Sequence, residues 1–542
     1  MLGKFLKRFL LFALTVFVIS CSKGGGGVDQ DDEGNPPSNI TDLTVSEVTP
    51  NSIKLTWTAP SDDDPSGRAA EYDMRVAMEE ITYLNFDSAY KLDGEPLPGP
   101  AGARDSITVT GLMEDSTYYF ALNSGDKDEN WSWISNCAYG ICFDNYVVDI
   151  PDSMLEVMLR SVLVKPDGPI YRTDLLNVYF LDCNNRLIAD LTGLEHCLNL
   201  HTMLFWNNRP ASLTPLAPLT RMVSLQMGHN ALADISPLAG MTELTTLYLH
   251  DNSISNITAL SNMTKLRDLN LLLNNISDIS ALSGKDSLRA LDLSQNHIVS
   301  ISPLAGMTKL EVLFLDLNEI VDIAPVSGLT ALLSLKLNDN DAVVIPSLSN
   351  LTSLGYLSLN NNQLNDISGL GGLGSLQFLS LQNNHIVEIS ALSGLTGLTV
   401  LDLRSNDIIE VTSLAALTEL ETLHLTMNEI ETIEDLTALT KLKYLYFSYN
   451  QISDISALSG MTGLVDLQFY NNQVDDISAL AGLTNLARLA IMNNQITDIT
   501  PLVNNSGLGA GDEVYLTGNP LTQESIDMIQ TLRDRGVTVS WL

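Results

Sequence analysis

A spacing of apolar residues repeats every 22 residues from Leu200 to residue 507 without an insertion. Each unit follows the template L-x-x-L-x-L-x-x-N-x-I-x-D-I-x-x-L-x-x-L-T-x. Because successive strand side chains point to opposite faces, L-x-L predicts a short strand with both leucines turned inward. The ninth position is asparagine in every unit: Asn208, Asn230, Asn252, Asn274, Asn296, Asn318, Asn340, Asn362, Asn384, Asn406, Asn428, Asn450, Asn472 and Asn494.

The repeat predicts a stacked array, since a single unit buries too little apolar surface to offset the entropy of ordering it. The asparagine amide can bond backbone groups of its own turn and of neighbouring coils. A fixed period of this length with this leucine spacing is the signature of a leucine-rich-repeat solenoid, a curved parallel β-sheet. The register resembles the 22-residue repeats of the internalins of bacterial surfaces.

Both ends of the array are expected to be capped. After Pro151, the residues Leu155, Met158, Leu159 and Val162 fall on one face of a helix, and a degenerate coil starts at Val178. At the far end, Asn519 opens a partial coil, followed by a short helix and a last alternating segment. Two departures inside the array, Pro210 and Lys285, are expected to loosen it locally.

The segment before the array alternates apolar and polar residues with period two, as at Ile53, Leu55 and Trp57, between turn-forming stretches. About a hundred residues of short alternating strands predict an antiparallel β-sandwich. The segment resembles a bacterial fibronectin type III domain: Trp57 falls where the second-strand tryptophan would, and Leu112 to Tyr118 resembles the tyrosine corner. The resemblance implies a spacer.

The first residues have the layout of an export signal. Lys4, Lys7 and Arg8 precede an apolar run that is too short to span a bilayer. The run ends at Val18-Ile19-Ser20-Cys21, which resembles a bacterial lipobox and implies cleavage before Cys21 and lipidation of that residue. The resemblance implies an exported protein anchored by lipid to the bacterial membrane, with Ser22 favouring the outer membrane and possible exposure at the cell surface.

These patterns divide the chain into six parts. They are a signal peptide (1–21), a Gly-, acid- and Pro-rich tether (22–37), a fibronectin type III-like domain (38–145), a helical cap with a degenerate first repeat (146–199), fourteen 22-residue repeats (200–507) and a C-terminal cap (508–542).

The amino-acid composition limits the kinds of partner that the chain can bind. With 65 acidic and 28 basic residues, the net charge of −37 disfavours nucleic acid and anionic membrane surfaces. Apart from Cys21, four cysteines remain, and Cys137–Cys142 and Cys183–Cys197 are plausible disulfide pairs in an oxidising compartment. The cysteines and histidines have no zinc-site spacing, so we expect no metal site and no cofactor.

The binding face is predicted from the repeat frame. Side chains at the third, fifth and seventh template positions point out of the sheet and have no role in the core. Exposed aromatic side chains at such positions are typical anchors of protein interfaces. The candidate ligand-binding residues are His424, Tyr444, Tyr446, Gln468, Tyr470, Arg488 and Met492, with Tyr449 at the rim, and Trp206 and Tyr248 nearer the N-terminus; His250, Phe314, Tyr356 and Phe378 lie on the same face.

Three readings of this face stay open. The first is adhesion or recognition through an extracellular or envelope protein ligand, as the internalin resemblance implies. The second is glycan capture by the aromatic side chains, and the third is a structural envelope protein, since aromatic residues suit any sheet surface. Asp402, His424 and Tyr446 share one column, but an open sheet offers neither pocket nor oxyanion site, so we expect no enzyme.

Overall fold

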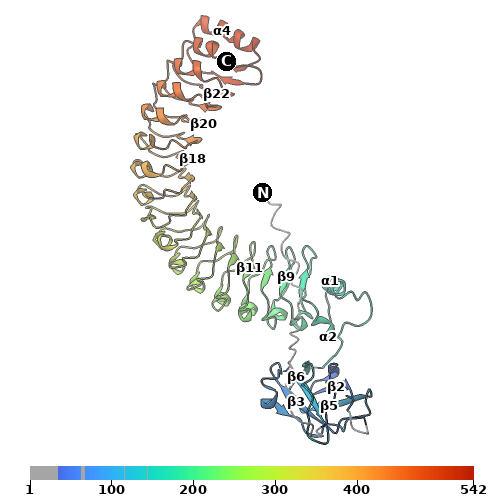
Figure 1. The fold of residues 1–542 in the computed structure, drawn as a ribbon. Coiled ribbons are helices and arrows are strands. Elements are labelled where there is room, and N and C mark those ends of the chain that lie inside the picture. Colours follow the sequence, from blue (N-terminus) through green and yellow to red (C-terminus); the bar gives the residue numbers. More distant parts are fainter. Residues whose placement is uncertain (1–33, 63–66, 115, 143, 542) are drawn as a thin grey trace, which may run out of the picture. The chain divides into compact units, whose positions relative to one another are not determined.

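A computed structural model of the chain describes residues 34–62, 67–114, 116–142 and 144–541. The signal segment and the lipobox cysteine Cys21 lie outside these residues. The chain forms two compact units, Met1–Asn145 and Tyr146–Leu542 (Figure 1).

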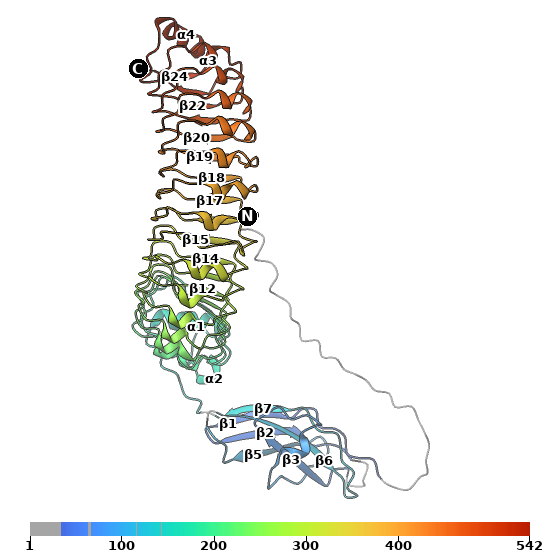
Figure 2. The ribbon, with the colours of Figure 1, turned by 90° about the vertical axis from the view of Figure 1, so that its left-hand side faces the viewer.

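The first unit is a sandwich of two antiparallel sheets, as its period-two alternation predicts (Figure 2). Trp57 is fully buried in its core and meets the Tyr72 ring edge-on at 5.3 Å. The backbone N–H of Met113 donates to Tyr118 Oη at 3.0 Å, so the tyrosine corner is confirmed. One sheet has the order β1 (Thr44–Thr49), β2 (Ser52–Thr58), β5 (Arg104–Thr110); the other has β4 (Tyr90–Lys91), β3 (Glu71–Ala77), β6 (Ser116–Gly125), β7 (Ala138–Cys142), with a 3₁₀ turn η1 (Phe86–Ser88).

The second unit opens with a helical cap. The helix α1 (Ser153–Leu163) begins after Asp152, whose carboxylate accepts from the N–H groups of Met154 and Leu155. Its buried residues include Leu155 and Leu159, whereas Val162 is 38% exposed, so the predicted apolar face is narrower than expected. A short helix α2 (Arg172–Leu175) and the turn η2 (Leu194–His196) flank the first strand of the sheet.

The array forms one parallel sheet of 17 strands, on the concave side of the solenoid (Figure 1). Each strand pairs with the next at matching template positions, with Leu445 between Leu423 and Leu467. The strands are β8 (Phe180–Asp182), β9 (Thr202–Leu204), β10 (Ser224–Gln226), β11 (Thr246–Tyr248), β12 (Asp268–Asn270), β13 (Ala290–Asp292), β14 (Val312–Phe314), β15 (Ser334–Lys336), β16 (Tyr356–Ser358), β17 (Phe378–Ser380), β18 (Val400–Asp402), β19 (Thr422–His424), β20 (Tyr444–Tyr446), β21 (Asp466–Gln468), β22 (Arg488–Ala490), β23 (Glu513–Tyr515) and β24 (Thr538–Ser540).

Short 3₁₀ turns line the convex side, opposite the strands (Figure 1). Their apolar residues close the core, as with Leu238 and Leu304, which are fully buried. The turns are η3 (Thr214–Leu216), η4 (Ser236–Gly240), η5 (Thr258–Leu260), η6 (Ser280–Leu282), η7 (Ser302–Leu304), η8 (Ala324–Gly328), η9 (Ser368–Leu370), η10 (Ser390–Gly394), η11 (Thr412–Leu414), η12 (Glu434–Ala438), η13 (Ser456–Gly460) and η14 (Ser478–Gly482).

The template asparagines join successive coils. In Asn340, Nδ2 donates to the carbonyl oxygens of Leu315 in the preceding coil, at 2.9 Å, and of Leu337 in its own coil, at 3.3 Å. Its Oδ1 accepts from the N–H of Ile320 at 3.0 Å. The side chain therefore satisfies three backbone groups that would otherwise be buried without partners, and the predicted role is confirmed.

The far end of the solenoid contains elements that the repeat frame does not predict. The helix α3 (Thr500–Asn504) replaces a 3₁₀ turn, and the next strand, β23, starts 25 residues after β22 instead of 22. The helix α4 (Gln523–Asp534) is capped by Thr522 and ends before Gly536, whose φ of +93° suits glycine. The C-terminal cap thus adds β23 and β24 to the sheet.

All four cysteines of the described residues are free thiols, so the predicted disulfides are wrong. Cys137 precedes β7 and Cys142 ends it; five residues of extended chain hold them roughly 16 Å apart on opposite faces. Cys183 and Cys197 are fully buried in the first coil, where they pack as small apolar side chains. Burial raises the pKa of both thiols to about 12.

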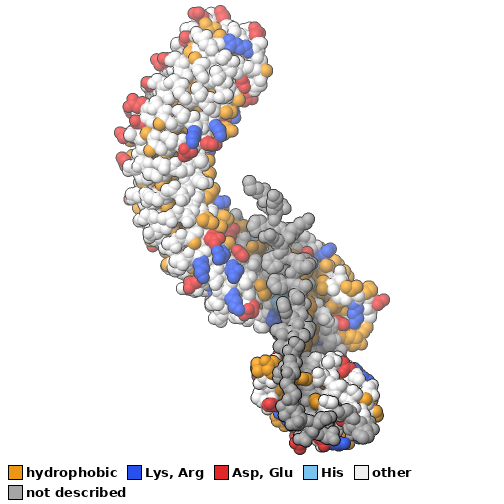
Figure 3. Space-filling view, viewed as in Figure 1, with side chains coloured by type: hydrophobic (Ala, Val, Ile, Leu, Met, Phe, Trp, Pro, Cys, Tyr) orange, Lys and Arg blue, Asp and Glu red, His pale blue; other side chains and the backbone are white. Residues whose placement is uncertain are grey.

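Basic side chains of the solenoid lie beside acidic ones of the neighbouring coil (Figure 3). Lys265 Nζ lies 2.6 Å from Glu243 Oε1, and Lys443 Nζ lies 2.8 Å from Glu421 Oε2. Because the chain has 65 acidic and only 28 basic residues, many acidic side chains have no such basic partner, and they make the surface negative. Among the described residues, no helix is both long and apolar enough to cross a membrane.

Candidate binding surfaces on the concave face

The repeat places one set of side chains on the open face of the sheet. In most strands the central residue is buried and its two neighbours are partly exposed, as in β19, where Leu423 lies between Thr422 and His424. This follows from the alternation of a strand that covers a core on one side only. The predicted ligand-binding residues therefore face solvent, and they fall into separate groups along the face.

Eight of them gather on four adjacent coils near the C-terminal end, and we call this group the tyrosine surface. The Tyr446 ring stacks on His424 with centroids 4.5 Å apart and planes 24° from parallel. Tyr446 Oη donates to Asp466 Oδ2 at 3.2 Å, and Gln468 Nε2 donates to Asp466 Oδ1 at 3.0 Å. The surface comprises His424, Tyr444, Tyr446, Tyr449, Gln468, Tyr470, Arg488 and Met492.

The remaining tyrosines extend this surface to the rim. Tyr449 is 48% exposed and meets the Tyr470 ring edge-on at 5.3 Å. Tyr444 is 41% exposed on β20. Beneath them, Phe447 and Phe469 stack in the core at 5.3 Å, where most other coils have leucine. The tyrosines therefore stand on a layer of rigid aromatic residues.

Tyr515 belongs to the same region, although the sequence analysis missed it. The Arg488 guanidinium lies 5.7 Å from the centre of the Tyr515 ring and 3.8 Å from Glu513 Oε2. Tyr515 Oη donates to Glu513 at 2.9 Å. The three-residue insertion before β23 takes Tyr515 out of the 22-residue frame, so the frame could not identify it as a concave residue.

The electrostatics of the tyrosine surface favour neutral side chains with fixed hydrogen bonds. Burial lowers the pKa of His424, and nearby Asp402 only partly offsets this effect. Burial, followed by the charge of Asp466, raises the pKa of Tyr446 to about 12. At neutral pH this histidine and this tyrosine are therefore uncharged and present ring faces rather than charges.

Asp402, His424 and Tyr446 do not form a relay. Asp402 is bound by Arg404, whose Nη2 lies 2.6 Å from Oδ2, and His424 stacks on Tyr446. Within the described part of the chain, no hydrogen bond joins Asp402 to His424. Likewise, no cluster of three or more His, Cys, Asp or Glu side chains there could hold a metal ion.

A second aromatic group crosses the centre of the concave face. The Tyr356 and Phe378 rings stack at 4.3 Å with planes 4° apart. Lys336 Nζ lies 4.8 Å from the Phe314 ring and 5.8 Å from the Tyr356 ring. The Lys336 ammonium group thus already makes cation–π contacts with two rings of its own chain. These contacts hold the three side chains in place.

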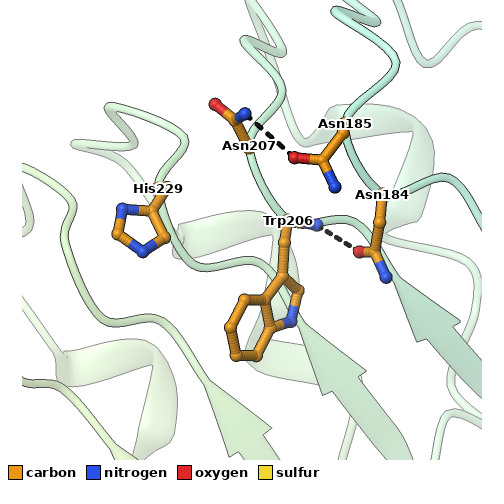
Figure 4. Close-up of a pocket in the computed structure, with 5 residues that line it drawn as sticks. All are labelled: Asn184, Asn185, Trp206, Asn207 and His229. Atoms are coloured by element: carbon orange, nitrogen blue, oxygen red, sulfur yellow. Dashed lines mark hydrogen bonds between the residues drawn. The ribbon is translucent and has the colours of Figure 1, made fainter.

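The third group lies at the N-terminal end. The Trp206 and His250 rings meet edge-on at 4.7 Å, and His229, which the sequence analysis missed, meets His250 at 5.2 Å. Trp206 and His229 line a hollow with asparagine side chains of the first coils (Figure 4). Tyr248 lies in the next column of this region, half-buried on β11.

Comparison with known proteins agrees with both units. The family "Leucine Rich repeats (2 copies)" matches residues 220–262, 286–329 and five overlapping stretches from 374 to 504, "Leucine rich repeat" matches 242–298, and "Fibronectin type III domain" matches 35–137. The structure of an internalin, InlF of Listeria monocytogenes, is 31% identical over 69% of this chain and 96% of that protein, with a TM-score of 0.50. The chain belongs to the internalin-like leucine-rich-repeat proteins.

Other internalin-like and repeat structures share the fold. A leucine-rich-repeat protein of Leptospira interrogans aligns with 68% of this chain at 24% identity and a TM-score of 0.62. InlJ of Listeria monocytogenes, whose functional domain includes a cysteine ladder, aligns at 22% identity and a TM-score of 0.53. This internalin-like chain has no cysteine after Cys197, and leucine, isoleucine and other apolar side chains fill the core of its later coils.

A curated human protein, calcium-activated chloride channel regulator 4, is 34% identical over 109 residues. The match covers 19% of this internalin-like chain and only 12% of that protein. Leucine-rich-repeat and fibronectin type III folds are typically non-enzymatic binding scaffolds.

Proposed function

We propose that this protein binds an extracellular or envelope protein through the concave face of its solenoid, with the tyrosine surface as the main contact. The observation that carries the proposal is the arrangement of Tyr444, Tyr446, Tyr449 and Tyr470 on adjacent coils. All four are partly exposed, and three of them, Tyr446, Tyr449 and Tyr470, are already held in place by ring contacts, with a hydrogen bond at Tyr446. Rigid aromatic residues lose little entropy on binding and are common hot spots of interfaces.

The negative charge of the chain limits the kind of protein that this surface can bind. Two carboxylates contact the tyrosine surface: Asp466 accepts a hydrogen bond from Tyr446, and Glu513 lies 3.8 Å from Arg488, which is the one Lys or Arg side chain of that surface. The whole chain carries −37. A neutral or basic protein surface therefore fits this face better than an acidic one, and nucleic acid is disfavoured.

The test compares the full chain with a variant in which Tyr444, Tyr446, Tyr449 and Tyr470 are all serine. Each protein is used as bait for chemical crosslinking to extracts of surface proteins from neighbouring or host cells. We expect the parent to capture a defined partner and the variant to lose most of it, because four anchors of the interface are removed.

The matched control changes Tyr83 and Tyr90 to serine, since these tyrosines are 73% and 69% exposed on the other unit. It should capture as the parent does, and all three proteins should have the same melting temperature within a few degrees. Equal capture by all three proteins would count against the tyrosine surface and place the contact elsewhere on the chain. No capture by any of them would favour a structural envelope role.

We further propose that Cys21 is lipidated and anchors the protein to the bacterial membrane, in the outer membrane and exposed at the surface. Several acyl chains on one residue make anchoring stable, so Cys21→Ala should move the protein from the membrane fraction to the soluble fraction. Protease added to intact cells should cleave the parent protein. Membrane association that survives the substitution would contradict this anchor.

A further inference from the structure

A hollow of about 420 Å³ opens at the N-terminal end of the concave face. Its wall consists of one indole, one imidazole and three carboxamides (Figure 4). No charged side chain lines it among the described residues, although the chain is strongly acidic. The lining residues are Asn184, Asn185, Trp206, Asn207 and His229.

Trp206 is fixed in place on several sides. Its backbone N–H donates to Asn184 Oδ1 at 2.7 Å, and its Nε1 donates to Gln226 Oε1 at 3.2 Å. The next coil has Gly228 in the same column, where a Cβ atom would lie 2.4 Å from the His250 ring. The missing side chain lets His250 lean across this coil and meet Trp206.

The carboxamides are left with unused hydrogen-bonding atoms. Because a backbone N–H can only donate, Asn184 must turn its oxygen to Trp206, which leaves Nδ2 free. Asn207 Nδ2 donates to Asn185 Oδ1 at 3.0 Å, which leaves one acceptor on Asn207 and one amide donor on Asn185. In the described part of the chain these three groups have no other side-chain partner, so they can bond a ligand.

A second hollow of about 350 Å³ continues from the first and shares Asn207 and His229 as a wall. Its other lining residues are Arg209, Asn230, Asp251 and residues adjacent to them in the chain. Asp251 is already paired with His229. Together the two hollows offer room along the rim for more than one small ring.

We infer that the Trp206 hollow binds carbohydrate. The apolar face of a saccharide ring can pack on an indole, and its hydroxyl groups both donate and accept, as the free atoms of Asn184, Asn185 and Asn207 require. A protein anchor would instead favour a dry apolar pocket, with few unpaired amides. Burial and the neighbouring His229 lower the pKa of His250, so the ring that supports Trp206 is neutral at neutral pH.

The test measures binding of the full chain to an immobilised panel of oligosaccharides ending in glucose, galactose, N-acetylglucosamine, mannose or sialic acid. Two substitutions probe the hollow. Trp206→Ala removes the stacking surface and should weaken binding by roughly thirtyfold, as for an interface anchor. Asn184→Asp keeps the acceptor for the Trp206 N–H but removes the free donor, and should weaken binding by roughly fivefold.

The control is Tyr446→Ala at the opposite end of the face, which should bind the same saccharide as the parent does. It also separates this inference from the proposed protein ligand, whose capture should depend on Tyr446 and not on Asn184. Melting temperatures show whether each variant folds, and Asn184→Asp stays informative if Trp206→Ala is unstable. If the parent binds no saccharide of the panel, or if both hollow variants bind as well as the parent, the inference is wrong.

Discussion

Lys285 is a fully buried cation in a column of apolar residues. All but one of the other 22-residue repeats have methionine or leucine at this position, as at Met263 and Met307. Its Nζ donates to the carbonyl oxygen of Ser261 at 3.1 Å, the only hydrogen bond that Nζ makes within the described part of the chain. Burial lowers its pKa, so the fold disfavours the protonated form. The backbone around Lys285 keeps the regular coil, with the turn η6 before it and β13 after it. We therefore expect Lys285 to lower the free energy of unfolding without changing the shape of the coil.

We predict that Lys285→Met raises the free energy of unfolding by roughly 2 kcal/mol at pH 7. Because the folded pKa is lowered from 10.5, the parent becomes more stable as pH rises from the folded pKa towards 10.5. The gain from the substitution should therefore shrink between pH 7 and pH 10. Thermal melts at both pH values measure this, and a gain that does not change with pH would contradict the explanation.

At the scale of the element, the coil of residues 332–353 departs from the others. No 3₁₀ turn is found in it between β15 and β16, where Ile345 and Pro346 belong to no helix or strand. Its carbonyl groups approach the next coil so closely that a Cβ on Gly369 would lie 2.1 Å from Pro346 O and 2.2 Å from Ile345 O. The glycine of one coil thus accommodates the proline of the coil before it.

We predict that Gly369→Ala lowers the free energy of unfolding by roughly 1–3 kcal/mol, because two backbone oxygens must move. Gly394 is the matched control: it also lies in a 3₁₀ turn, and a Cβ added there would meet no atom within 4 Å. Gly394→Ala should be neutral or slightly stabilising. Urea unfolding of the two variants measures the change in the free energy of unfolding. Equal changes would show that the close contact at Gly369 does not affect stability.

The 22-residue period predicted those features that depend on one coil and its neighbour. The strands, the buried leucines and the asparagine bonds of Asn340 all follow from the template. Features that span three coils, such as the contact of Trp206 with His250 across Gly228, depend on three particular residues at once and have no signature in the period. The period did not predict Tyr515 as a concave residue either, because the insertion before β23 shifts it out of the 22-residue frame.

At the scale of the whole molecule, a row of aspartates follows the strands at the thirteenth template position. Each carboxylate accepts from the N–H two residues later, at the start of a 3₁₀ turn or, for Asp498, of α3, as Asp278 does from Ser280 at 2.8 Å. These backbone bonds lower the pKa of Asp234, Asp278 and Asp366 below 3.8. Since the coils stack into one array, small losses at many caps add up along it.

The sign of the pH effect follows from these lowered values. A carboxyl group whose folded pKa is lowered stabilises the fold above its unfolded pKa of 3.8, and this stability is lost as pH falls through the folded pKa. We predict that the triple variant Asp234→Asn, Asp278→Asn and Asp366→Asn has a melting temperature within a few degrees of the parent's at pH 7. An amide oxygen accepts the same bond without titrating, so between pH 4 and pH 2 the parent should lose more melting temperature than the variant. Parallel losses in both proteins would show that acid unfolding has another origin, such as the carboxyl groups of the first unit.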